Sequence, residues 1–378
     1  MDTQKVIPNS RAYLPVFICV GKLEEKVTAV QYLYKQVSLR KPFRLARHST
    51  LSRLYLRLAK SAGSRVFTVL YTLLFYAWQK AVPFPSEGEF LYEGTVLSKP
   101  IRFNAKNTQF EAVYNPLFDR GYEPEIGALL DIVLERKGAF IDIGSNWGYF
   151  ALHAASLAKF HGYVYACEPF PSTFADLTSV VSQAGLGDKI TCWQVAFGQK
   201  KAWVKMSYRG LLQSGLAALD AQKDLEAKSF LYSSSKVEVT TLDDVITEPP
   251  SVIKIDVEGA ESDVLWGGKA TINKHKPMII FENSTWPEDV ARTLEPLITL
   301  TKWGYQLFYP CWQLDYRRDP FFSGELTEGS GGRTQKLALL PLNAGTRFVF
   351  SPRINVFACH ESRINSIKRS FTSGNTKS

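Results

Sequence analysis

The sequence predicts an α/β protein built on a doubly wound, mostly parallel sheet. From about residue 97, apolar runs of strand length alternate with helix-like segments. One of these runs turns through glycines into a helical pattern, and several of them end in an acid. With 378 residues, 45% of them hydrophobic and 21% charged, the chain is long enough for one large domain with an extension.

The first 82 residues differ from the rest in charge: they carry 14 Lys/Arg and 3 Asp/Glu, against 31 and 33 in the remainder. Residues 49–60 predict an amphipathic helix. The apolar run 66–78 would span about 20 Å as a helix, too short for a bilayer core of about 30 Å. We therefore predict a basic, helical N-terminal extension over residues 1–82.

Two interpretations of this extension remain open. It could be an arm packed on its own domain or on a second subunit, which would make the protein a homo-oligomer. Alternatively, residues 49–82 could lie in a membrane interface, because basic residues flank an aromatic-rich apolar run there. Five scattered cysteines without a C-x-x-C pair favour reduced thiols, so we expect a cytoplasmic protein, with peripheral membrane contact under the second interpretation.

The elements of the main body follow in order. Residues 83–120 are expected to be a linker that leads into a main domain over 121–362. The expected strands are 99–104, 139–143, 162–167, 189–195, 202–207, 236–240, 251–256, 277–282, 305–309 and 353–358. The expected helices are 124–135, 147–159, 172–184, 242–247 and 259–268. Glycines at 329–332 predict a loop insertion over about 318–346, and residues 363–378 are expected to be a mobile tail.

The glycine turn after the strand 139–143 is the first candidate binding feature. Asp142 ends the apolar run, and the chain then passes through Gly144, Ser145, Asn146 and Gly148 into a helical pattern. Such a turn lets a ligand approach backbone N–H groups at a helix N-terminus. A dinucleotide fingerprint reads G-x-G-x-x-G, and here Asn146 occupies the middle glycine position. The spacing therefore favours a nucleoside ligand without a pyrophosphate.

Acids also end the next strands of the predicted sheet. Glu168, followed by Pro169 and Phe170, ends the second strand, where a carboxylate can accept the hydroxyl groups of a ribose. Phe170 could stack on a purine. Residues 253–261 place Asp256, Glu258 and Glu261 after a buried strand, where charges are costly unless they are paired or used, although helix capping explains some of them. Residues 278–283 repeat the pattern, and end in Glu282 and Asn283.

Together these strand ends resemble the FkbM family of S-adenosylmethionine-dependent methyltransferases. The resemblance covers about residues 120–310. The matching pieces are Tyr122-Glu123-Pro124-Glu125, residues 141–148, Glu168-Pro169, Thr241-Leu242-Asp243-Asp244, residues 253–261 and Phe281-Glu282. The resemblance implies a class I (Rossmann-like) methyltransferase fold and O-methylation of a hydroxyl group on a sugar, glycolipid or other small metabolite.

The same resemblance places S-adenosylmethionine over the glycine turn, its ribose on Glu168 and its adenine near Phe170. The residues expected to bind it are Asp142, Gly144, Ser145, Asn146, Gly148, Glu168, Pro169, Phe170, Ala196, Phe197 and Asp256. Methyl transfer from a sulfonium needs mainly positioning of the acceptor oxygen and removal of its proton. We expect Asp256 to serve there as a catalytic residue, with Glu261 and Glu282 as weaker candidates.

Several alternatives remain. Oxygens of Asp256, Glu282 and Asn283 could hold Mg²⁺, although a metal is not expected. A nucleic-acid substrate is not expected, because the turn at 256–259 lacks prolines and aromatics and carries two acids that repel phosphate. A non-catalytic, methyltransferase-like binding or scaffold protein at a membrane surface is the competing function.

Overall fold

The computed structural model describes residues 32–47, 87–94, 98–104, 107–114, 118–209, 213–218, 233–316, 319–326 and 334–372. Its centre is a parallel sheet in the order β7-β6-β5-β12-β13. These strands are β5 (Ala139–Ile143), β6 (Tyr163–Cys167), β7 (Ile190–Trp193), β12 (Pro250–Ile255) and β13 (Met278–Ser284). The order 3-2-1-4-5 is that of a doubly wound sheet, so the predicted parallel core is confirmed.

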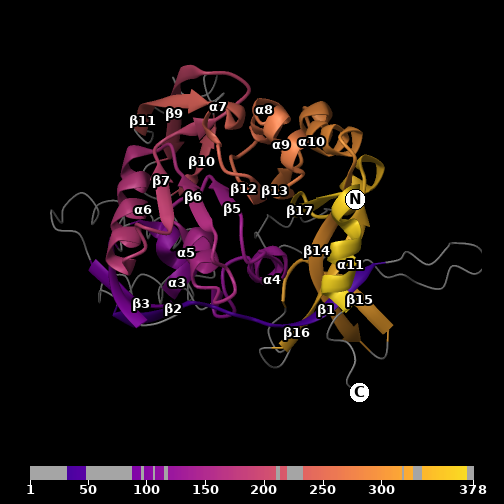
Figure 1. Cartoon of the computed structure of the whole chain (residues 1–378), viewed down its shortest axis with the longest axis horizontal. Coiled ribbons are helices and arrows are strands. Elements are labelled where there is room, and N and C mark those ends of the chain that lie inside the picture. The colour runs from indigo at the N-terminus through magenta and orange to yellow at the C-terminus, as the bar shows by residue number, and fades with distance from the viewer. Residues whose placement is uncertain are drawn as a thin grey trace, which may run out of the picture.

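The sheet continues beyond β13 as a mixed, ten-stranded sheet. β17 (Arg353–His360) runs antiparallel between β13 and β14 (Tyr305–Tyr316). Beyond β14 follow β16 (Thr334–Leu342) and then β1 (Leu33–Ser38), and β15 (Asp319–Ser323) pairs with β14. Figure 1 shows β1 from the N-terminal part of the chain beside β16 at this edge.

Helices cover both faces of the sheet, as the apolar side chains of its strands require. One core contains side chains of α4 (Pro124–Val133), α5 (Tyr149–Ala155), α6 (Pro171–Ala184) and α11 (Ile364–Thr372). The other contains side chains of α7 (Leu242–Val245), α8 (Glu261–Gly267), α9 (Lys269–His275) and α10 (Val290–Lys302). Neighbouring strand residues alternate between the two cores, as Phe140 and Ile141 do.

Two smaller sheets flank this body. One is β2 (Phe43–Arg47), β3 (Glu87–Glu93) and β4 (Ser98–Asn104), of which β2 and β3 are labelled at the lower left of Figure 1. The other is β10 (Gln213–Ala218), β9 (Ala202–Arg209), β11 (Ser233–Thr240) and β8 (Ala196–Phe197). The Gln183 side chain ties β4 to α6: it accepts the Arg102 N–H at 2.8 Å and donates to the Arg102 carbonyl at 3.0 Å.

The N-terminal predictions are corrected where the structure describes them. Within residues 1–82, the described part forms the strands β1 and β2 and no helix. In β1, burial alternates from residue to residue, because one side of this edge strand packs on the body and the other faces solvent. The expected helix 49–60 and the apolar run 66–78 lie outside the described residues.

Three further segments are more ordered than predicted. Besides β4, which matches the expected strand 99–104, the expected linker 83–120 contains β3, the 3-10 turn η1 (Thr108–Phe110) and α3 (Glu111–Tyr114). The expected loop insertion contains β15, β16 and part of η5 (Ala344–Val349). The expected tail contains α11, which buries Ile364, Ile367 and Phe371. Of the helices in the described parts of the chain, none is long and apolar enough to span a membrane.

Candidate functional site

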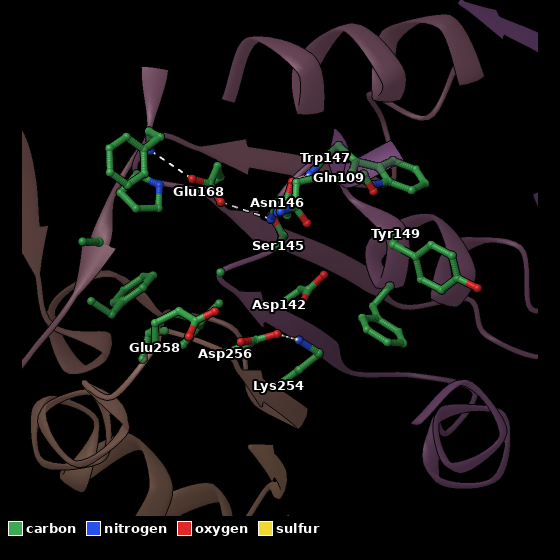
Figure 2. Close-up of a pocket in the computed structure, with 18 of the residues that line it drawn as sticks. Gln109, Asp142, Ser145, Asn146, Trp147, Tyr149, Glu168, Lys254, Asp256 and Glu258 are labelled. Atoms are coloured by element: carbon green, nitrogen blue, oxygen red, sulfur yellow. Dashed lines mark hydrogen bonds and ion pairs between the residues drawn. The ribbon is translucent and has the colours of Figure 1, made fainter. Parts of the chain in front are cut away.

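A pocket opens at the carboxyl ends of β5, β6 and β12 (Figure 2). Here β5 and β12 lie side by side while their crossovers leave in opposite directions, which is where doubly wound sheets bind ligands. Ten of the eleven predicted cofactor-binding residues line it. They are Asp142, Gly144, Ser145, Asn146, Glu168, Pro169, Phe170, Ala196, Phe197 and Asp256. Gly148, the eleventh, does not line the pocket and lies directly before α5.

The turn after β5 forms the floor of the pocket. Gly144 has a φ of +77°, and a Cβ there would lie 1.8 Å from the backbone oxygen of Asp256. The N–H groups of Gly144 and Ser145 both donate to the Cys167 carbonyl at 3.0 Å. Only glycine allows this close approach, so the turn holds the ends of β5, β6 and β12 together.

Glu168 projects from the end of β6 toward this turn. Its two oxygens accept the N–H of Asn146 at 3.1 Å and the N–H of Phe170 at 3.0 Å (Figure 2). The side chain is only 6% exposed, and burial raises its pKa to about 7 although both hydrogen bonds lower it. Asn146 has a φ of +53°, a conformation that Asn tolerates better than most residues. A carboxylate so fixed keeps further lone pairs for a ligand in the pocket.

Asp142 lines the pocket beside the glycine turn. It is completely buried, and neither carboxylate oxygen has a hydrogen-bond partner within the part of the chain that the structure describes. Burial raises its pKa to about 6, while the charge of Lys254 lowers it. A buried carboxyl group without partners is costly unless a ligand supplies the donor.

Asp256 follows β12 and faces the pocket opposite Glu168 (Figure 2). The Nζ of Lys254, a residue only 3% exposed, donates to Asp256 Oδ2 at 3.0 Å and lies 4.9 Å from the centre of the Phe150 ring. Burial lowers the pKa of Lys254, but Asp256 and Asp142 outweigh burial and raise it. Lys254 thus stays charged inside the pocket wall.

A second cation, Arg353 of β17, completes this side of the pocket. It lines the pocket and bonds both Glu282, at the end of β13, and Glu258, at 3.2 Å. Burial raises the pKa of Glu282 to about 8 and that of Glu258 to about 7, while Arg353 lowers both.

Sequence reasoning missed both cations. Lys254 had a signal, because a charge inside an otherwise apolar strand must be paired. Arg353 had no such signal in the sequence, because β17 pairs with β13 only in the folded chain.

Other predicted site residues do not converge on the pocket. Glu261 accepts the Gly259 N–H at 3.0 Å and so holds the turn before α8. Neither Glu261 nor Glu282 lines the pocket, so only Asp256 of the predicted catalytic acids does. The roles of the residues that do line it stay predictions.

The structure does not bring Asp256, Glu282 and Asn283, the alternative metal set, together around one point. Asn283 donates to the Thr293 carbonyl at 2.9 Å and accepts from Arg347, away from Glu282, because neighbouring strand residues point to opposite faces. Within the described ranges, no group of three or more His, Cys, Asp or Glu side chains is arranged to hold a metal ion.

Residues 142–307 match the family model of the methyltransferase FkbM domain. This range is similar to the FkbM domain over somewhat less than half of the chain. Among solved structures, an FkbM methyltransferase from Methylobacillus flagellatus is 17% identical, with 55% of this chain and 44% of that chain covered and a TM-score of 0.33. The chain therefore spans less than half the length of that protein. No curated protein matches the sequence.

Two other solved structures show the same kind of distant similarity. A precorrin-6y C5,15-methyltransferase from Geobacter metallireducens is 12% identical, with 58% and 88% of the two chains covered and a TM-score of 0.31. Fibrillarin from Aeropyrum pernix, with natively bound S-adenosyl-L-methionine, is 14% identical, with 57% and 73% covered and a TM-score of 0.26.

The range that matches the FkbM model contains most, but not all, of the residues that line the pocket. Asp142, Glu168 and Asp256 lie inside the matched range, whereas Tyr122 and Arg353 lie outside it. The parallel strands that hold the first three residues form the mostly parallel centre of the α/β sheet that the resemblance implies.

Proposed function

We propose that this protein is an S-adenosylmethionine-dependent methyltransferase that methylates a hydroxyl group of a small molecule. The observation that carries this proposal is the Glu168 carboxylate, fixed by the N–H groups of Asn146 and Phe170 above the Gly144 turn. A carboxylate at this strand end suits a ribose with two free hydroxyl groups.

The remaining lining residues suit the other parts of the same ligand. Phe170, Ala196 and Phe197 form an apolar wall for the adenine. The unpartnered oxygens of Asp142 accept from the α-ammonium group. When bound, S-adenosylmethionine supplies a methyl group on a sulfonium, which is already activated for transfer.

Asp256 is the group we propose for the acceptor side. Lys254 holds its Oδ2 at 3.0 Å, which leaves the other oxygen for the acceptor hydroxyl group. In an in-line displacement, Asp256 then orients that hydroxyl and takes its proton, so positioning and general-base catalysis come from one side chain.

The charges around the pocket favour a neutral acceptor such as a sugar or the sugar part of a glycolipid. Four carboxyl groups line the pocket against two cations, and both cations already pair with acids. A phosphate group would be repelled, so nucleic acid is not the proposed substrate. The basic residues 49–82 could bring the protein to an anionic membrane that carries such an acceptor.

Titration calorimetry on the full chain tests the cofactor. We expect S-adenosylmethionine and S-adenosylhomocysteine to bind, and NAD⁺ not to bind. Absence of binding by either adenosyl ligand would favour the scaffold alternative. For the acceptor, metabolite and glycolipid profiles of a deletion strain should lack a product that carries one additional CH₂ group.

Membrane contact is tested separately, by flotation of the full chain with anionic vesicles at low salt. Protein that stays at the bottom of the gradient would remove that part of the proposal.

A further inference from the structure

Glu123, directly before α4, adopts a backbone conformation that glutamate rarely takes. Its φ is 41° and its ψ is 63°, in the left-handed region, where glycine is favoured and Asn is tolerated. Its carbonyl accepts the N–H of Ile126 at 2.9 Å and so begins the helix. Its side chain makes no capping hydrogen bond, which is the usual reason for a polar residue at this position. Neither the turn nor the cap therefore explains a glutamate here.

The other non-glycine residues with a left-handed backbone indicate the reason for a glutamate at position 123. Among non-glycine residues in the described ranges, Glu123, Asn146, Glu258 and Lys276 have positive φ. Asn146 and Glu258 line the pocket, and Glu123 follows the lining residue Tyr122. Lys276 instead ends α9, where left-handed residues are common. Backbone strain of this kind gathers at functional sites, so Glu123 belongs with the pocket.

The Glu123 carboxyl group contributes to the charge that surrounds the buried cation Lys254. Its Oε2 is buried and has no hydrogen-bond partner among the described residues. Lys254 feels the charges of three carboxyl groups, from Asp256, Asp142 and Glu123, and of these only Asp256 bonds it. Burial raises the pKa of Glu123, while Lys254 and Arg353 lower it. The groups that face Glu123 are Lys254, Asp256, Arg353, Tyr122, Glu125 and Asn355.

We propose that Glu123 is a positioning residue that offsets the charge of Lys254, so that the pocket prefers the sulfonium of S-adenosylmethionine to the neutral thioether of S-adenosylhomocysteine. The inference rests on the proposed function. The two ligands differ by one methyl group and one positive charge, so their affinity ratio reports the local potential. An uncompensated ammonium in the pocket wall would repel the sulfonium, a charge that S-adenosylhomocysteine lacks, whereas its effect on the amino-acid groups is common to both ligands. Glu123 acts through Lys254 because, unlike Lys254, it does not line the pocket.

The test compares the two ligands by calorimetry at pH 8, which favours ionised carboxyl groups. In Glu123→Gln and Glu123→Gly, we expect the ratio of the Kd for S-adenosylmethionine to the Kd for S-adenosylhomocysteine to rise at least about threefold. Glu123→Gly should also raise Tm by about 2 °C, because glycine relieves the left-handed strain. Lys276→Gly is the matched control: it relieves the same strain, so Tm should rise while the ratio stays unchanged.

Each outcome decides between the two proposals. A wild-type chain that binds neither ligand refutes the proposed function, and the inference falls with it. A wild-type chain that binds both, with a ratio that Glu123→Gln and Glu123→Gly leave unchanged, overturns the inference alone. Parallel losses of both affinities, with a lower Tm in Glu123→Gly, would show a purely structural role for Glu123.

Discussion

The two ends of the pocket hold their carboxylates by different means. At the Glu168 end, backbone N–H groups from two turns fix the side chain. At the Asp256 end, side chains do so: Lys254 holds Asp256, and Arg353 from a distant strand holds Glu258 and Glu282. Backbone donors persist for as long as the fold does, whereas paired side chains change with single substitutions. Under the proposed function, the first end binds the cofactor and the second end binds the acceptor.

The substitution with the largest expected effect on stability lies at Gly144, where the two ends of the pocket are in contact. In Gly144→Ala, the new Cβ would lie 1.8 Å from the Asp256 backbone oxygen, at a φ of +77°. We expect a loss of about 3 kcal/mol or more in the free energy of unfolding, measured by urea denaturation. Gly187→Ala is the control, because nothing lies within 4 Å of its new Cβ. Equal stability of the two variants would show that the ends can separate freely.

Removal of the Glu168 carboxylate should affect the cofactor end alone. Glu168→Ala removes both acceptors for the proposed ribose, so the Kd for S-adenosylmethionine should rise more than tenfold, about 1.4 kcal/mol. Calorimetry measures the Kd, and circular dichroism checks that the variant is folded. Glu288→Ala, at an exposed acid of the chain, should bind as the wild type does. An unchanged Kd in folded Glu168→Ala would refute the ribose role.

Rising pH should destabilise the folded protein through carboxyl groups at both ends of the pocket, each in its own pH range. Burial raises the pKa of Glu168 to about 7 and that of Glu282 to about 8, from 4.5. The folded chain then keeps protons that the unfolded chain releases, so this stabilisation is complete below about pH 4.5 and is lost as the pH rises through the two folded values.

Scanning calorimetry of the apo protein between pH 5 and pH 8.5 measures this loss as a falling Tm. Glu282→Gln should flatten the curve mainly near pH 8, and Glu168→Gln mainly near pH 7. A wild-type Tm that rises across this range would contradict both assignments.

The difference between the two ends of the pocket also explains which site residues can be predicted from the sequence. β5 and β12 are buried along their whole length, so their apolar runs mark them, and Asp142, Glu168 and Asp256 follow such runs directly. The partnership of Arg353 with Glu282 depends on the pairing of β17 with β13, which no local pattern encodes. The strands β1 and β16 are recognisable mainly through their partners.

The helix α11, by contrast, can be recognised from the sequence. Ile364, Ile367 and Phe371 have the spacing of one helix face, and they pack α11 onto the sheet. The polar composition of residues 363–378 hides this pattern, so the sequence predicts a tail there.

The smallest effect is expected from metal removal, which tests whether side-chain pairs alone organise the Asp256 end. Glu282 is already bonded by Arg353 and Ser284, and Asn283 is engaged by Thr293 and Arg347. A divalent ion would have to displace a guanidinium group and turn Asn283 across the sheet. We therefore expect EDTA to leave the Kd for S-adenosylmethionine unchanged. If EDTA weakens the binding of S-adenosylmethionine and Mg²⁺ restores it, a metal ion competes with Arg353 for the carboxyl groups at the Asp256 end. The two ends of the pocket would then differ by a metal ion as well as by the hydrogen-bond donors that hold their carboxylates.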